Sequence, residues 1–270
     1  MKTNNSSLPS SNYQTQYEHR HFRHLTLIKL IRILILLAFL AIWELTAYIG
    51  TIDRFFFSSP SQVVLCFWEM VKDFSFFIHT GITLFETLLS FLLVMVIGLL
   101  SATFLWYSEK SAEILEPYLV VLNSLPKSAL APLFIVWLGT GINTIIVAGI
   151  SVALFGSIIN LYTGFRQVDR EKIKLIYTLG GSKKDAFFQV VLPASIPTIL
   201  SNMKVNIGLA LVGVIIGEFL AARRGLGYLI IYGSQVFQLN LVITSIIILC
   251  LIAMGLYRLI QALESYYLKV

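Results

Sequence analysis

Six long apolar segments constrain this chain more than any other feature of its sequence. Each has about the 20 residues that a helix needs to cross the hydrocarbon core of a bilayer. We therefore predict an all-α polytopic membrane protein with about six transmembrane helices. With approximate ends, the segments are Leu27–Ile49, Thr83–Trp106, Pro117–Leu138, Ile142–Tyr162, Ser195–Leu220 and Leu241–Leu263.

The composition supports lipid as the solvent of this chain. Asp, Glu, Lys and Arg make up 13% of its 270 residues, against about 25% in soluble domains. The net charge of +6 comes mainly from residues that flank apolar segments, which suits orientation in a bilayer better than nucleic-acid binding. Cys66 and Cys250 lie far apart in apolar surroundings, so we expect buried small side chains and neither a disulfide nor a metal site.

The organisation predicted from these segments is a disordered tail, residues 1–26, followed by a membrane domain, residues 27–265. The tail is polar without a helical apolar period, and no cleavable signal peptide is evident, so the first span is expected to remain as an anchor. A short helix is expected around Ser61–Val71. Fourteen Lys and Arg residues fall on the side of the tail and four on the other, which predicts that both termini are cytoplasmic.

The third segment is interrupted by Asn123 and Pro126. Proline removes a backbone donor, and the freed carbonyl needs a partner that is not lipid. A kink at a helix contact and the lining of a translocation path explain this interruption equally well. The residues that we consider for such a path are Asn123, Pro126, Asn202 and Asn206.

The stretch from Gly164 to Pro193 is a cationic loop between two spans, and we call it the coupling loop. Asp169 is a plausible N-cap of a helix that runs to Leu179. Gly180 and Gly181 can take positive φ and end that helix, and Ser182 with Asp185 fits a capping box. The next helix presents Ala186, Phe187, Val190 and Val191, which need either a partner protein or the chain's own bundle to cover them.

The spacing from Gly180 to Val190-Val191-Leu192-Pro193 resembles the cytoplasmic signature of ABC importer permeases, Glu-Ala-Ala, three residues, Gly, nine residues, Ile-x-Leu-Pro. The chain from about residue 30 to 265 resembles the nitrate, sulfonate and taurine group of binding-protein-dependent permeases. The joint spacing is more specific than any one motif. Matching elements elsewhere are Ser59-Pro60-Ser61, Thr83-Leu84, Leu125-Pro126, Ala131-Pro132-Leu133, Trp137-Leu138-Gly139-Thr140-Gly141, Gly217-Glu218 and Gly225-Leu226-Gly227.

One departure from the family pattern is that Lys174-Leu175-Ile176 stands in place of Glu-Ala-Ala. Either Glu171 supplies the missing negative charge one turn earlier or the partner ATPase has changed with the loop, and we favour a dedicated ATPase. Under the resemblance, the residues that contact or shape the ATPase interface are Lys174, Leu175, Ile176, Leu179, Gly180, Gly181, Ser182, Phe187, Val190, Leu192 and Pro193.

The resemblance implies a type I ABC importer permease in a bacterial cytoplasmic membrane. Its expected partners are a second permease copy, two ATPase subunits and an extracytoplasmic binding protein. The chain has no Gly-x-x-x-x-Gly-Lys loop, so we expect no enzyme activity and no cofactor here, with ATP and Mg bound by the ATPase. The expected cargo is a small anion such as a sulfonate, nitrate or taurine-like compound, or alternatively a small heterocycle such as a vitamin precursor.

Charged residues within the apolar segments are few. Glu44, Glu86 and Glu218 lie near segment ends, where we expect headgroups and water to solvate them rather than an ion-coupling role. Lys204 either approaches the path or snorkels to phosphate. An ion-driven secondary transporter needs a clearer relay of such groups, and an anchor protein would not explain the patterned loop.

Two further motifs have a plain structural interpretation. Gly213 and Gly217 form a small-residue face, which we expect to pack within the subunit rather than across a dimer axis. The cluster from Glu18 to His24 lacks held metal geometry and fits a basic membrane flank better. We expect neither a metal site nor catalytic residues.

Overall fold

The computed structural model describes residues 12–50, 53 and 57–268, with side chains for 27–50, 53 and 57–267. All the regular elements within these ranges are helical, which confirms the predicted all-α class. The chain forms two compact units, Met1–Gln62 and Val63–Val270.

The first unit contains helix α1, Asn12–Ile49, whose apolar part Leu27–Ile49 is long enough to span a bilayer. The prediction of a disordered tail is wrong from Asn12 onward, and residues 1–11 lie outside the described range. Once the apolar part has nucleated a helix, each added residue gains a hydrogen bond at little cost. Near its end, the Glu44 carboxylate accepts bonds from the backbone N–H (3.0 Å) and hydroxyl (2.9 Å) of Ser61.

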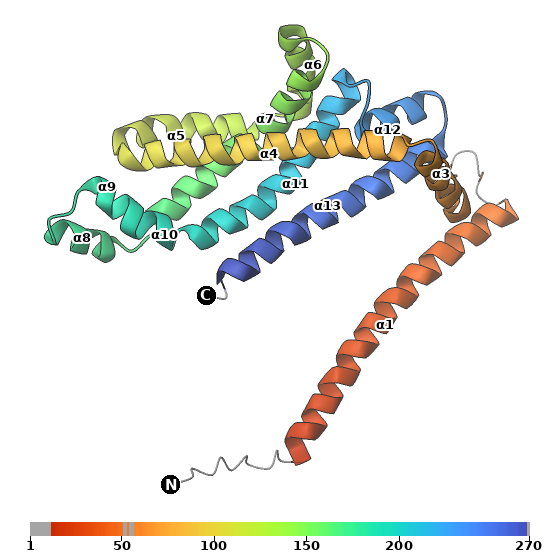
Figure 1. Ribbon diagram of the computed structural model, residues 1–270, viewed down its shortest axis with the longest axis horizontal. Helices are drawn as coiled ribbons and strands as arrows, with labels where there is room; N and C mark the ends of the chain where they lie inside the picture. Colours follow the sequence, from red (N-terminus) through yellow and green to blue (C-terminus); the bar gives the residue numbers. More distant parts are fainter. Residues whose placement is uncertain (1–11, 51–52, 54–56, 269–270) are drawn as a thin grey trace. The chain divides into compact units, whose positions relative to one another are not determined.

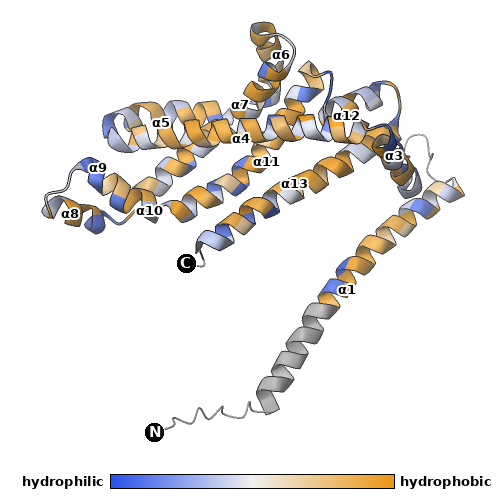
Figure 2. Ribbon diagram, in the orientation of Figure 1, coloured by the Kyte–Doolittle hydropathy of each residue, from blue (hydrophilic) through white to orange (hydrophobic). Residues whose placement is uncertain are grey.

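Four long helices form the body of the second unit, and they run side by side in Figure 1. They are α4 (Ser75–Tyr107), α7 (Ile142–Arg166), α11 (Ile196–Ala221) and α13 (Leu239–Leu268). Helix α11 packs against the other three, and α4 packs against α7. Most of their residues carry the hydrophobic colour in Figure 2, as expected for helices in lipid.

The third predicted segment is two helices, α5 (Glu109–Ser124) and α6 (Lys127–Leu138), bent by 95° at their junction. The structure has the predicted interruption at Pro126, but the chain bends there far more sharply than at a simple kink. Leu125 takes an extended conformation, because the ring of the following proline disfavours the helical region for the residue before it. The described residues contain five helices able to cross a membrane, or six if this bent pair counts as one span.

Short helices occupy both ends of the four-helix body (Figure 1). At the end that we call the loop end lie α8 (Arg170–Thr178), α9 (Lys183–Ala186), a π-helical turn (Phe187–Val191) and α10 (Leu192–Ala194). Near the far end are α3 (Pro60–Lys72), which matches the short helix expected around Ser61–Val71, α6 and α12 (Leu226–Gln235).

Helices α7 and α11 approach each other closely where α11 carries glycine. A Cβ atom on Gly213 would lie 2.8 Å from the Ala148 carbonyl oxygen, and one on Gly217 would lie 2.8 Å from the Ile145 Cα atom. At the loop end, a Cβ on Gly164 would lie 2.6 Å from the Thr198 methyl group. The structure thus places the Gly213–Gly217 face against α7 of the same chain.

We predict that Gly217→Leu lowers the thermal unfolding midpoint of the detergent-purified protein. The new side chain would meet the α7 backbone, and overpacking of this kind costs about 1–3 kcal/mol. The control is Gly208→Leu on the same helix, where nothing lies within 4 Å of the added Cβ, so both variants gain the same helix propensity. Equal midpoints for the two variants would contradict the packing argument.

Candidate functional site

The coupling loop begins with a capped helix. The Asp169 carboxylate accepts a bond from the Glu171 backbone N–H at 2.9 Å, as an N-cap does. Gly180 has a φ of +84° and follows the end of this helix, as predicted. The expectation of positive φ at Gly181 is wrong. Gly181 is required instead by close approach, because its Cβ would lie 2.9 Å from the Ile176 carbonyl oxygen, to which its own N–H donates at 2.9 Å.

The second half of the loop begins with the predicted capping box. The Asp185 N–H donates to the Ser182 hydroxyl oxygen (3.3 Å), and the Ser182 N–H donates to the Asp185 carboxylate (2.8 Å). The Ser182 hydroxyl also donates to that carboxylate at 2.6 Å. The Ser182 hydroxyl, followed by its backbone N–H, lowers the pKa of Asp185 below its ordinary value. The box therefore favours the ionised carboxylate.

We predict that acid loosens this turn. A carboxyl whose pKa is lower in the folded state contributes stability above its ordinary pKa of about 3.9 and loses it as pH falls through the folded value. Pepsin cleavage within the loop should therefore increase as pH drops below about 3.9. Asp185→Asn should cleave faster than wild type at higher pH and show less acid dependence, whereas Glu171→Gln serves as the control. An unchanged pH profile in Asp185→Asn would exclude the capping carboxylate as the cause.

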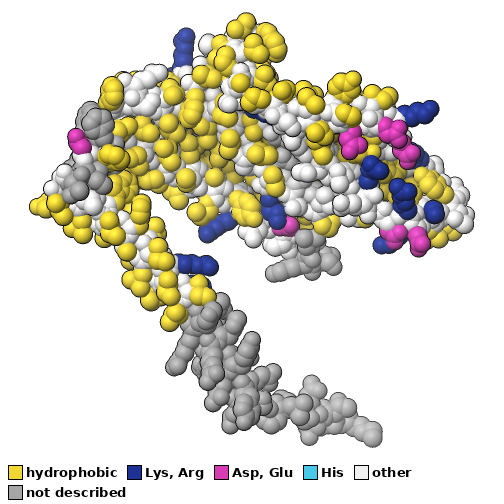
Figure 3. All heavy atoms as spheres, turned by 180° about the vertical axis from the view of Figure 1, so that it is seen from behind, with side chains coloured by type: hydrophobic (Ala, Val, Ile, Leu, Met, Phe, Trp, Pro, Cys, Tyr) yellow, Lys and Arg dark blue, Asp and Glu magenta, His cyan; other side chains and the backbone are white. Residues whose placement is uncertain are grey.

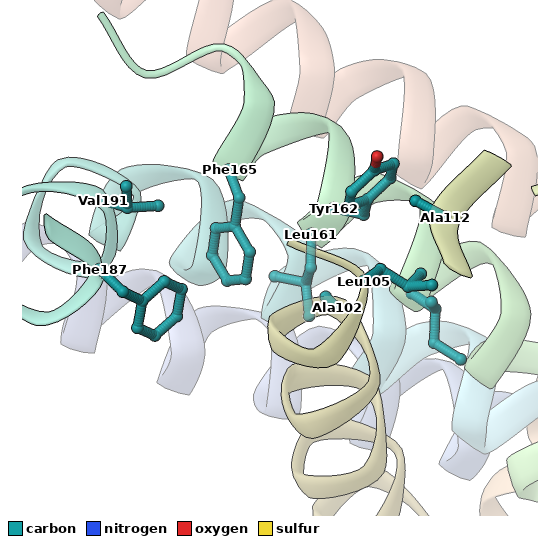
Figure 4. Packing of buried hydrophobic residues seen from close by; sticks show 9 residues of the cluster. Ala102, Leu105, Ala112, Leu161, Tyr162, Phe165, Phe187 and Val191 are labelled. Atoms are coloured by element: carbon teal, nitrogen blue, oxygen red, sulfur yellow. The ribbon is translucent and has the colours of Figure 1, made fainter. Parts of the chain in front are cut away.

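The loop is anchored to the body by Phe187 and Val191, which are buried. In Figure 4 both side chains lie beside Phe165 and Leu161 of α7. The Phe187 ring packs edge-on against Phe165, with centroids 5.6 Å apart, and also contacts Trp106 at 5.1 Å. Phe187 and Val191 are therefore covered by the chain's own helix bundle, which was one of the two possibilities considered above, and not by a partner protein.

Other apolar side chains of the loop remain uncovered in this subunit. Leu175 is 58% exposed and Leu179 is 75% exposed, and Phe188 is exposed as well. Lys174 and Pro193 are also exposed, whereas Ile176, Val190 and Leu192 are half-buried. Exposed leucines on a polar, cationic loop outside the apolar body indicate a contact surface.

A cleft of about 430 Å³ separates α8 from the start of α5 at the loop end. One wall carries Glu109, Glu113 and Glu116, and the other carries basic residues; Figure 3 shows charges of both signs gathered at one end of the body. No ion pair joins the two walls within the part of the chain that the structure describes. The basic residues that line the cleft are Arg166, Arg170, Lys174 and Lys183.

Glu218, near the far end of α11, is buried. Its side chain is 0% exposed and accepts hydrogen bonds from the Thr83 hydroxyl (2.7 Å) and the Gly227 N–H (2.5 Å). Thr83 in turn accepts a bond from the Leu226 N–H at 2.8 Å. Glu86, 3% exposed, is the next carboxyl beside it. The expectation that water solvates Glu86 and Glu218 is wrong, because protein donors surround Glu218 instead.

Two glycines make room for this carboxylate. A Cβ on Gly225 or Gly227 would lie 2.4 Å or 2.7 Å from the nearest Glu218 carboxyl oxygen or carbon. Gly225 also has a φ of +118° and donates its N–H to His79 Nδ1 at 2.9 Å. The sequence shows Glu218 followed by Gly225-Leu226-Gly227, but it does not show that the two glycines pack against the Glu218 side chain.

We predict that Glu218→Ala frees the segment between α11 and α12. Removing the two hydrogen bonds that Glu218 accepts, each worth about 0.5–1.5 kcal/mol net, should raise local opening about tenfold. Trypsin cleavage after the exposed Arg223 and Arg224 measures that opening. Glu69→Ala, at an exposed position of α3, is the control. Equal cleavage of the two variants would show that the Glu218 network does not hold this segment.

The structure divides the four predicted path residues into two pairs. Asn202 and Asn206 are buried on α11, where the Asn202 amide donates to the Ser157 hydroxyl (2.8 Å) and the Asn206 amide donates to the Asn202 carbonyl (2.9 Å). Asn123 and Pro126 lie at the break between α5 and α6, where both are exposed.

The structure also bears on the expectations for Lys204, for the two cysteines and for the cluster from Glu18 to His24. The Lys204 ammonium pairs with the Glu264 carboxylate of α13 at 2.7 Å, a partner that neither expectation for this residue included. Cys66 is half-buried but Cys250 is exposed, so the expected burial is wrong for Cys250. Side chains from Glu18 to His24 lie outside the described range. Among the described residues, no three His, Cys, Asp or Glu side chains lie close enough together to hold a metal ion.

Comparison with known proteins gives the family. The model of binding-protein-dependent transport system inner membrane components matches residues 94–265. The chain belongs to this family. It is an ABC importer permease related to the sulfonate and taurine group.

The relatives cover most of this permease. A probable ABC transporter permease of Haemophilus influenzae is 31% identical over 221 residues, covering 81% of this chain and 88% of its own. The formylaminopyrimidine transport permease ThiX of Halalkalibacterium halodurans is 30% identical over 71% and 76% of the two chains. The putative aliphatic sulfonates permease SsuC of Bacillus subtilis is 29% identical over 85% and 83%.

A solved structure of the MetNI methionine ABC transporter in an inward-facing conformation shares the fold. Its TM-score is 0.60 at 17% identity, and the match covers 68% of this permease and 92% of the other chain. This likeness confirms the predicted type I permease fold. The relatives that match in sequence differ in the solutes that their names state.

Proposed function

We propose that this permease is the membrane-spanning subunit of an ATP-driven importer and that its coupling loop docks on a separate ATPase. The observation that carries the proposal is that one loop is both anchored to the helix bundle by buried side chains and lined with exposed apolar side chains. Phe187 fastens the loop to α7, while Leu179 and Leu175 stand in solvent on capped helices. A rigid, uncovered apolar surface at the end of a membrane bundle suits a partner that pushes on it.

The proposed assembly holds two permease copies, two ATPase subunits and an extracytoplasmic binding protein. ATP and Mg belong to the ATPase in this proposal, and the permease contributes no catalytic residue. The excess of Lys and Arg on the loop side supports a cytoplasmic position for the loop. With α5 and α6 counted together as one crossing, both termini lie in the cytoplasm.

The departure at Lys174 gains a physical explanation from the cleft. Lys174 lines the same cleft as Glu109, Glu113 and Glu116, so carboxylates stand across from the cation that replaces the family's acidic residue. We propose that α5 supplies the negative charge on this side, in place of Glu171. The partner ATPase would then meet both elements together.

We predict that Leu179→Asp reduces the amount of co-purified ATPase about tenfold or more while the permease still inserts. Burying a leucine side chain contributes about 1.5–3 kcal/mol, and each 1.4 kcal/mol is tenfold in affinity. Val64→Asp is the matched control, since Val64 is 66% exposed on α3 near the far end. Retention of the ATPase by Leu179→Asp would contradict docking at this surface, whereas loss in both variants would indicate general damage.

Two classes of cargo are supported by different observations. The relatives named for sulfonate and taurine transport support a small anion. Relatives named for formylaminopyrimidine and riboflavin transport support a small heterocycle instead. The lining of the membrane helices favours the second class, as argued below.

A further inference from the structure

We propose that a polar hollow between α7 and α11 is a binding site for a small uncharged solute with hydrogen-bond donors and acceptors, such as an aminopyrimidine. The hollow has a volume of about 340 Å³, near the lower end of the range for small-molecule sites. This inference rests on the proposed import function, because it assigns the class of cargo. The polar residues that line the hollow are Asn160, Thr163, Gln167, Thr198, Ser201 and Asn202.

The position of these residues suits contact with water, solute or protein better than contact with lipid. Asn160, Thr163 and Ser201 are exposed in this subunit and lie on helices long and apolar enough to cross a bilayer. Asn160 lies six residues before the end of α7, about 9 Å along the helix axis. Amides at that depth lose hydrogen bonds to water if hydrocarbon covers them. They therefore face water, solute or protein.

The close approach of α7 and α11 forms the floor of the hollow. Gly164 lines it, and a Cβ there would lie 2.6 Å from the Thr198 methyl group, so the Thr198 side chain packs directly on the Gly164 backbone. The Asn202 amide is fixed by its bond to Ser157, which makes this part of the lining pre-organised.

Asn202 supplies an independent sign of a missing partner. The side chain is 4% exposed, and its Oδ1 atom has no hydrogen-bond donor among the described residues. A buried acceptor without a donor in the protein calls for one from water or solute. A ligand N–H group that reaches this part of the hollow would satisfy it.

The charges around the hollow decide the class of ligand. None of its lining residues is ionisable. Two cations are sequence neighbours of lining residues, and each is engaged elsewhere. Lys204 pairs with Glu264 at 2.7 Å, and Arg166 lines the cleft beside α8 with its guanidinium 5.7 Å from the centre of the Tyr162 ring. A sulfonate or nitrate removed from water requires cationic or charge-assisted donors, and this lining provides none. Amide and hydroxyl groups instead pair with the ring nitrogens and amino groups of an uncharged heterocycle.

Site-directed labelling tests this assignment in the complete complex with its ATPase, with Cys66→Ser and Cys250→Ser as the background. Ser201→Cys should react with a charged methanethiosulfonate reagent at least about tenfold faster than Val96→Cys. Val96 is the matched control because it is 49% exposed among exposed apolar neighbours on α4. Uncharged 4-amino-2-methylpyrimidine should slow the Ser201→Cys reaction severalfold, and ethanesulfonate should not.

Each contrary result overturns the inference. No reaction above the control, or oxidative cross-linking of Ser201→Cys between permease copies, would show that lipid or a second copy covers the hollow. Protection by ethanesulfonate alone, or by neither compound, would exclude an uncharged ligand. Adding Thr163→Lys should reverse the preference of the two probes, a change that a merely structural role would not produce.

The ATPase content of the same preparation separates this inference from the proposed function. If the ATPase co-purifies but the aminopyrimidine does not protect Ser201→Cys as expected, the proposed import function is retained and the proposed class of cargo is rejected. If protection is as expected but no ATPase co-purifies, the site stands and the docking proposal fails.

Discussion

The contact between α7 and α11 is the constraint on which the rest of the membrane domain depends. Lipid offers no hydrophobic force to hold helices together, so close backbone packing must do so. Gly213 and Gly217 meet the α7 backbone in one half of the contact, and Gly164 meets Thr198 in the other. Both halves of the contact thus hold α7 and α11 together along their length.

The coupling loop joins these same two helices, so its anchoring has a mechanical consequence. The chain leaves α7 at Arg166 and enters α11 at Ile196. Between them, Phe187 and Val191 fill a core against Phe165. A force applied to the exposed Leu175 and Leu179 would therefore reach both helices through packed side chains, not through a flexible tether. The π-helical turn at Phe187–Val191 carries both of the anchoring side chains, just before Pro193.

Local signals in the sequence predicted local structure well. The Asp169 cap, the Ser182–Asp185 box and the short helix after Pro60 each depend on residues within one or two turns. Features that depend on distant residues could not be predicted in this way. The burial of Glu218 needs Thr83, 135 residues away, and the Lys204 pair needs Glu264, 60 residues away. The sequence indicated an interruption at Pro126. It did not indicate the 95° bend, because a proline is equally expected at a simple kink.

The distribution of charge explains how one scaffold could serve both coupling and transport. Cations and glutamates gather at the loop end, where water screens them and a partner protein can contact them. Within the span region, each ionisable side chain of α11 has a partner in the protein: Lys204 pairs with Glu264, and Glu218 accepts bonds from hydroxyl and backbone donors. The hollow between α7 and α11 is thereby left with dipoles alone. On the proposed function, a lining of dipoles suits a passage, because no buried ion pair has to be broken when an uncharged solute leaves.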